Sequence, residues 1–118
     1  MKKLILLLFV SAFVLFFSCK KKDNAAEQTP FSYTSLIASE SIISVTSSLH
    51  IVATATGDDL QYSWKSVDTE GNNFGNIIGS GNDIQWTICH ADNFIVSCTV
   101  SDKYGNSETK TVSIRSTL

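Results

Sequence analysis

The chain has 118 residues, of which 43% are hydrophobic, and its formal charge at pH 7 is −2. This length is sufficient for one compact domain with a modest hydrophobic core. Residues 30–118 carry four basic and nine acidic side chains, a net charge of −5 with histidine neutral, whereas three consecutive lysines occupy positions 20–22. A domain with this acidic balance lacks the basic surface that nucleic-acid binding requires, so we expect no nucleic-acid partner.

The N-terminal segment has the pattern of an export signal. Lys2 and Lys3 precede a run of fourteen residues, 4–17, in which Ser11 is the only polar residue. A span of the bilayer needs roughly 20 apolar residues, whereas the apolar part of a signal peptide is shorter. We therefore predict that residues 1–18 are a signal peptide.

The apolar run ends at a cysteine, in the sequence FFSCKKKD at positions 16–23. A small residue before a cysteine at this point resembles the lipobox of bacterial lipoproteins, although Phe16 and Phe17 replace the leucine and small residue that are usual there. The resemblance implies cleavage before Cys19 and acylation of its thiol, by a chain such as palmitate, and of its new amino group. Several acyl chains hold a protein firmly on a membrane, whereas one binds only marginally. An ordinary secretory signal or a short transmembrane anchor is the alternative.

The residues after the cysteine predict a location and a tether. The KKKD run at 20–23 is similar to the charged tags that send some Gram-negative lipoproteins to the cell surface, the alternative being a solvated linker. We expect a lipid anchor in the outer membrane, on the cell-surface or the periplasmic face. Residues 20–30 contain no large apolar side chain, so residues 19–30 are predicted to be the lipidated cysteine and a flexible tether. Pro30, the only proline, marks the boundary of a domain over residues 31–118.

From residue 31 onward, apolar residues recur at every second position, which is the period of a β-strand with one buried face. Clusters of Gly, Asn and Asp separate these runs and indicate turns. The pattern predicts an all-β fold, an antiparallel Ig-like β-sandwich. We expect about seven strands: 32–37 or 42–46 at an edge, then 48–56, 60–67, 74–79, 83–89, 93–101 and 107–115.

Three stretches of this domain resemble bacterial Ig-like domains related to the PKD family. Residues 55–64 (ATGDDLQYSW) are similar to the GDxLxYxW stretch of that group, and residues 84–87 (IQWT) to its VxWT strand. Residues 94–107 (FIVSCTVSDKYGNS) are similar to its YxVxCxVxDxxGN strand and hairpin. The sequence KSVD follows Trp64, where PKD domains proper have DFGDG, so the broader Ig-like label fits better. The resemblance implies an adhesive, spacer or ligand-presenting module and supplies no catalytic residues.

Two cysteines, Cys89 and Cys98, remain if Cys19 is lipidated, and export permits disulfides. Cys98 has the inward parity of its strand, whereas Cys89 has the opposite parity from Trp86 and Ile88. A bridge requires the two Cα atoms to lie within about 7 Å. A Cys89–Cys98 disulfide is therefore one option, and a core Cys98 that acts as a small hydrophobic residue is the other.

The side chains suited to metal binding or catalysis do not occur at the sequence spacing of a known metal site or catalytic motif. Cys89 and His90 are adjacent, so their side chains diverge on a strand, and no second pair has zinc spacing. Asp58, Asp59 and Asp102 lie at loop ends and could bind calcium, but aspartates in turns more often accept backbone hydrogen bonds. We expect no metal, no cofactor and no enzymatic activity.

The aromatic residues divide into two groups. Tyr62, Trp64 and Trp86 have inward parity and are predicted to belong to the core. Tyr104 lies at the tip of the last hairpin beside Asn106, and these two residues are the candidates for contact with a protein or glycan ligand. Packing of the turn is the alternative explanation.

Two functions are consistent with these patterns. The first is a non-enzymatic, lipid-anchored envelope module for binding, adhesion or spacing. The alternative is a small envelope enzyme or enzyme inhibitor, with a site near Cys89, His90 and Asp92 where titratable groups would have to share a cleft.

Overall fold

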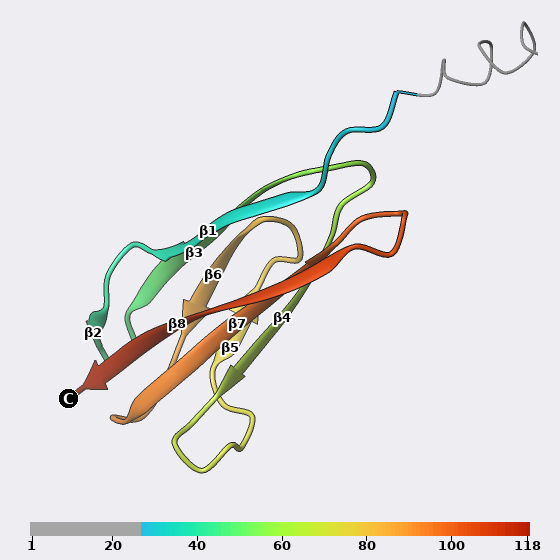
Figure 1. Cartoon of the computed structure of the whole chain (residues 1–118). Helices are drawn as coiled ribbons and strands as arrows, with labels where there is room; N and C mark the ends of the chain where they lie inside the picture. The colour runs from blue at the N-terminus through green and yellow to red at the C-terminus, as the bar shows by residue number, and fades with distance from the viewer. Residues whose placement is uncertain (1–26) are drawn as a thin grey trace, which may run out of the picture.

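The computed structural model describes residues 27–118, which form eight β-strands (Figure 1). The strands are β1 (Ser32–Ala38), β2 (Ile42–Ser44), β3 (Ser48–Thr56), β4 (Gln61–Val67), β5 (Asn76–Ile78), β6 (Asp83–Thr87), β7 (Asn93–Ser101) and β8 (Ser107–Thr117). The predicted all-β fold is confirmed. The predicted signal peptide, Cys19 and the first part of the predicted tether lie outside the described residues.

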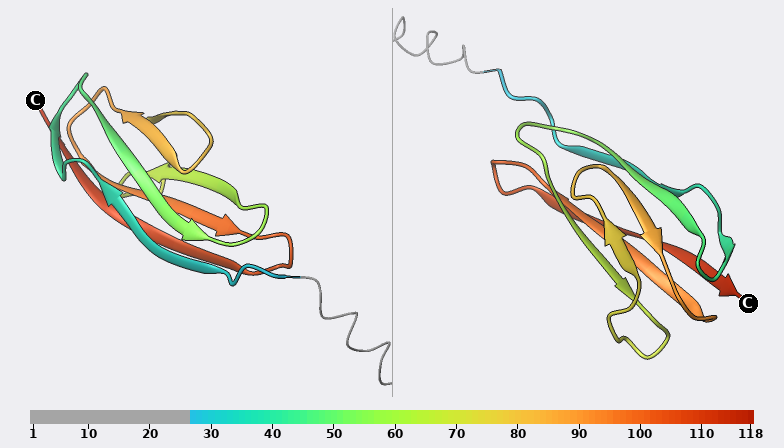
Figure 2. Two further views of the ribbon diagram at one scale, coloured as in Figure 1. Left: turned by 90° about the horizontal axis from the view of Figure 1, so that it is seen from above. Right: turned by 180° about the vertical axis from the view of Figure 1, so that it is seen from behind.

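The strands form two four-stranded sheets that face each other (Figure 2). The strand order is β1-β3-β6-β5 in one sheet and β2-β8-β7-β4 in the other. Neighbouring strands pair antiparallel except β2 and β8, which pair parallel. This is the arrangement of Ig-like sandwiches, in which the first, second, fifth and fourth strands of the seven-strand fold share one sheet.

The first part of the domain differs from the expectation of one edge strand. Both candidate segments are strands, and they lie in different sheets: β1 pairs with β3, and β2 pairs with β8. The chain crosses between the sheets at residues 39–41, which allows Leu36 and Ile43 each to be buried from its own sheet. The neighbouring Ile37 and Ile42 remain exposed. The domain therefore has eight strands because the edge segment is divided in two.

The core is formed by the inward residues of both sheets, as the period-two pattern predicts. Trp86 lies at its centre, fully buried, with its ring edge on Phe94 at a centroid distance of 5.4 Å. Its indole N–H donates to the Ser66 hydroxyl at 2.8 Å, which satisfies a polar group that burial would otherwise penalise. Tyr62 and Trp64 pack against this core but remain partly exposed because β4 is an edge strand.

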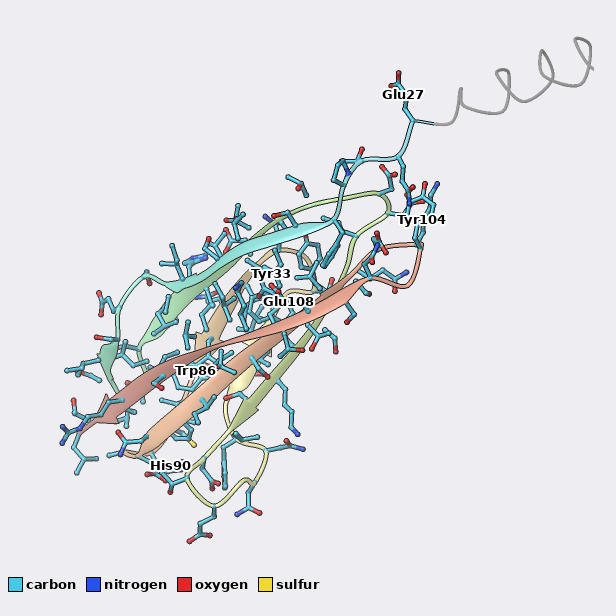
Figure 3. The ribbon with its side chains drawn as sticks, in the orientation of Figure 1. Glu27, Tyr33, Trp86, His90, Tyr104 and Glu108 are labelled. Atoms are coloured by element: carbon cyan, nitrogen blue, oxygen red, sulfur yellow. The ribbon has the colours of Figure 1, made fainter. Side chains whose placement is uncertain are left out.

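Two groups of loops close the sandwich at opposite ends (Figure 3). The entry end, where residue 27 leads into the domain, contains the β3–β4 turn at 57–60 and the β7–β8 hairpin at 102–106 (Figure 1). The far end contains the β4–β5 loop at 68–75, the β6–β7 loop at 88–92 and the C-terminus. Glu27 and Tyr104 lie at the entry end, and His90 lies at the far end.

Candidate functional site

The turn of the β7–β8 hairpin at the entry end is held by hydrogen bonds to one carboxylate, that of Asp102. Asp102 accepts the backbone N–H groups of Tyr104 and Asn106 at 3.0 and 2.9 Å, and the Asn106 side-chain amide at 2.8 Å. Burial acts to raise the pKa of Asp102, but these hydrogen bonds, led by those from Asn106, hold it below its usual value. Asn106, a candidate ligand contact, therefore has its side-chain amide bonded within its own turn.

Tyr104, the other candidate contact, is exposed at the hairpin tip and bonded to the β3–β4 turn. Its hydroxyl donates to Asp58 Oδ2 at 3.2 Å, and the backbone N–H of Thr29 donates to the same oxygen at 3.0 Å. These bonds, that from Thr29 foremost, lower the pKa of Asp58. Tyr104 as a whole residue remains 47% exposed. The entry segment, the turn and the hairpin are thus joined at one carboxylate.

The three aspartates considered for calcium do not form one site. Asp102 accepts hydrogen bonds from its own loop, Asp58 accepts them from Thr29 and Tyr104, and the Asp59 carboxylate lies 3.8 Å from Lys103 Nζ. The neighbouring side chains, Tyr104 in its ionised form and then Asp59, raise the pKa of Lys103. Within residues 27–118, no group of three His, Cys, Asp or Glu side chains is placed to hold a metal ion. Asp102 is thus a turn-forming residue, Asp58 joins the entry segment and the hairpin, and Asp59 faces a lysine.

At the far end, Cys89, His90 and Asp92 are close in sequence but have separate roles. The half-buried His90 ring contacts Phe74 and Phe94 edge-on, at centroid distances of 4.8 and 5.4 Å. The Asp92 carboxylate accepts the N–H of Asn93 at 2.7 Å, and Cys89 is exposed. No hydrogen bond in the described part of the chain links the three side chains. His90 instead belongs to a row of rings that runs from Phe74 at the surface to Trp86.

The two cysteines of the domain are free, so no Cys89–Cys98 disulfide is formed in this structure. Cys98 is fully buried in the core, and burial raises the pKa of its thiol. The hydroxyl of Tyr33 donates to the Cys98 carbonyl at 3.2 Å, and burial raises the pKa of that tyrosine as well. Cys98 therefore packs as a small hydrophobic residue in the core.

Sequence reasoning missed Phe74, which separates two hollows on one side of the far end. It is 42% exposed and lines both hollows together with Gly75. The first, about 450 Å³, includes Ile88 and Cys89. The second, about 400 Å³, lies beside β4 and includes Trp64 and Ile77, besides Ser63, Lys65, Ser66 and Asn73. The period-two pattern placed Phe74 at the start of a strand and gave no sign of its exposure.

A third hollow, of about 470 Å³, lies on the outer face of the β2-β8-β7-β4 sheet at the far end. The exposed Ile42 and Ile95 line it together with Arg115. These three hollows lie towards the far end or beside β4, whereas the entry end is closed by hydrogen bonds.

Neither a scan against protein-family models nor a search of curated proteins returns a match for this chain. In the described part of the chain, no helix is long and apolar enough to cross a membrane.

Proposed function

We propose that this chain is a bacterial lipoprotein, anchored in the outer membrane through Cys19, whose single Ig-like domain acts as a non-enzymatic binding module of the cell envelope. The export signal at 1–18, the lipobox-like cysteine and the polar segment that follows support the anchor. The resemblance to PKD-related Ig-like domains supports an adhesive or ligand-presenting role over catalysis.

The observation that carries the proposal is the difference between the two ends of the domain: one is closed by hydrogen bonds, and the other has hollows at its surface. The domain is entered at the end closed by Asp58 and Asp102, and the hollows lie at the other end and beside β4. Residues 20–30 span at most about 40 Å when fully extended. A lipid at Cys19 would therefore hold the entry end towards the membrane and leave the far end accessible to a partner.

Metabolic labelling tests the anchor. The full-length protein, expressed in a Gram-negative host, should incorporate labelled palmitate and partition with the membrane fraction. Its Cys19→Ala variant should do neither, because the thiol that carries the acyl chain is missing. Cys89→Ala is the matched control and should label normally. Equal labelling of the wild type and Cys19→Ala would contradict the proposal.

Protease treatment of intact cells tests the orientation. A cell-surface domain is degraded by protease added outside, whereas a periplasmic domain is degraded only after the outer membrane is permeabilised. The KKKD segment predicts surface exposure, and replacement of Lys20, Lys21 and Lys22 by Ala should transfer the domain to the protected fraction. If wild type and variant are equally protected, the segment is a linker and not a surface tag.

A further inference from the structure

We propose that the open edge of β4, at Tyr62 and Trp64, binds an extended segment of a partner protein, which adds to the β2-β8-β7-β4 sheet as a new edge strand. This inference rests on the proposed function in two respects: it names the class of partner for a domain taken to bind, and it uses the proposed membrane anchor to argue against a second copy of the chain. Binding by strand addition uses backbone hydrogen bonds for affinity and side-chain pockets for specificity.

The chain itself shows how this edge accepts a strand. The Asp68 N–H donates to the Asn72 carbonyl at 2.9 Å, and the Phe74 N–H donates to the Ser66 carbonyl at 3.1 Å. An antiparallel bridge joins Val67 and Asn73. The segment 72–74 therefore begins a strand along β4, on the edge away from β7. It ends after Phe74, and the chain continues into β5, which pairs with β6 in the opposite sheet.

Gly75 makes this departure possible. Its φ is +93°, a left-handed conformation that favours glycine, and a Cβ at this position would lie 2.5 Å from Trp86 Nε1. The chain passes directly over the buried Trp86–Ser66 pair as it leaves β4. The rest of the β4 edge is left without a neighbouring strand because its covering segment is diverted here.

The uncovered groups of β4 belong to Tyr62 and Trp64. Alternate residues of a strand direct their N–H and C=O groups to the same edge. The Ser66 carbonyl and the Asp68 N–H are directed to residues 72–74. The register with β7 is continuous from Gln61 to Val67, so Tyr62 and Trp64 direct theirs the same way. In the described chain, no backbone hydrogen bond meets them. Each can exchange two hydrogen bonds with an antiparallel guest residue.

The other sheet edges have features that disfavour strand addition. Natural edge strands are protected by shortness or by bulges. β2 and β5 have three residues each, and the register of β1 shifts between Tyr33 and Ser35. β4 has seven residues and no register shift against β7, and Lys65 is its only charged residue. Its uncovered part, residues 61–65, therefore has neither the three-residue length of β2 and β5 nor the register shift of β1.

The hollow of about 400 Å³ beside β4 indicates what the guest carries. Trp64, Phe74 and Ile77 form its apolar part, and Trp64 is held in place by its indole N–H, which donates to the Gly81 carbonyl at 2.9 Å. A guest residue opposite Trp64 shares its side of the sheet, so its side chain would meet this surface. The guest is thus an extended segment with apolar residues at alternate positions.

The geometry favours a partner protein over a second copy of this chain. β4 runs along the sandwich from the entry end towards the far end (Figure 1). Symmetric antiparallel pairing of two β4 strands would point the two entry ends in opposite directions. Two chains anchored in one membrane would then require one tether to run back along its whole domain.

Hydrogen exchange with peptide probes tests the proposal. The full-length protein in detergent is mixed with nine-residue peptides in which Thr alternates with Val, Leu or Phe. At least one of these peptides should slow exchange of the Tyr62 and Trp64 amides by about tenfold or more at saturation. The same peptides with alternate backbone nitrogens methylated should have no effect, because they cannot supply the hydrogen bonds.

A pair of variants locates the effect on the protein. Tyr62→Pro removes an N–H that β7 does not use, a position where an edge strand tolerates proline, and should abolish protection of Trp64. Tyr62→Phe keeps that N–H and should bind like the wild type. If Tyr62→Pro fails to fold, the methylated peptides still decide the question.

Three results would overturn the proposal. The first is that no peptide slows amide exchange, and the second is that exchange slows at β1 or β5 instead. The third is that exchange of the Tyr62 and Trp64 amides slows as the protein concentration rises without peptide, which would assign the edge to a second copy. Palmitate labelling at Cys19 is independent of all three, so failure of the edge site and failure of the anchor are distinguishable.

Discussion

The two ends of the sandwich are closed by different chemistry. At the entry end, Asp58 and Asp102 accept hydrogen bonds from the loops around them, including the backbone of Thr29. At the far end, aromatic rings pack edge to face in a row from Phe74 through His90 and Phe94 to Trp86. Hydrogen bonds to a charged oxygen fix the chain where it enters the domain. Ring packing closes the far end less completely and leaves hollows at its surface.

The largest effect is expected at the inner end of the ring row. Trp86→Ala removes a fully buried indole and its bond to Ser66, which should lower the free energy of unfolding by about 3–5 kcal/mol. Urea denaturation measures it. Trp64→Ala, at the partly exposed edge, is the comparison and should cost clearly less. Equal losses for the two variants would contradict the assignment of Trp86 as the centre of the core.

A smaller loss of unfolding free energy is expected from a substitution at residue 75, where the chain passes over Trp86. Gly75→Ala places a Cβ 2.5 Å from Trp86 Nε1 at a φ of +93°, which should cost about 2–3 kcal/mol. Gly81→Ala is the matched control, because nothing lies within 4 Å of its Cβ, and its stability should stay within about 0.5 kcal/mol of the wild type. Equal stability of the two variants would show that the backbone at residue 75 does not lie close against Trp86.

The entry end should respond to acid. The folded-state pKa of Asp102 is lowered, so its contribution to stability is present above the ordinary aspartate pKa of about 3.9 and is lost as pH falls through the lowered value. Asp102→Asn keeps an oxygen acceptor but has no charge to titrate. Between pH 5 and pH 2, the midpoint temperature of thermal unfolding should therefore fall less steeply for this variant than for the wild type. Parallel curves would contradict the role given to the carboxylate.

The smallest effect is expected at the hairpin tip. Tyr104→Phe removes one exposed hydroxyl that donates to Asp58, and the unfolding free energy should change by no more than about 0.5 kcal/mol. The pKa of Asp58, followed by NMR titration, should remain below its usual value because the Thr29 N–H contributes most to the shift. A return of the Asp58 pKa to the ordinary value would show that Tyr104 is the main cause.

The regular strands could be predicted from the sequence because their apolar residues alternate without interruption. β7 has the predicted bounds, and β3 does as well. The parallel pairing of β2 with β8 could not be predicted, because it joins residues more than seventy positions apart and leaves only Ile43 buried in β2. The predicted strand at 74–79 is reduced to residues 76–78 because Gly75 turns the chain between sheets.

The candidate site was harder to predict because it also depends on contacts between residues that are far apart in the sequence. Sequence alone places Tyr104 and Asn106 on a hairpin tip, and they are found there. It does not reveal that this hairpin lies beside the entry segment, since the contact of Thr29 with Asp58 depends on the whole sandwich. The exposure of Phe74 and the open edge of β4 are likewise consequences of where the chain changes sheet.

The distance of each end from the membrane is the most direct test of the account. In the Cys89→Ser background, a fluorophore is placed at Tyr104→Cys on the entry end or Glu70→Cys on the far end, and the lipidated protein is inserted into vesicles that carry a headgroup quencher. The account predicts strong quenching of the label at position 104 and weak quenching at position 70. Equal quenching, or stronger quenching at position 70, would contradict it.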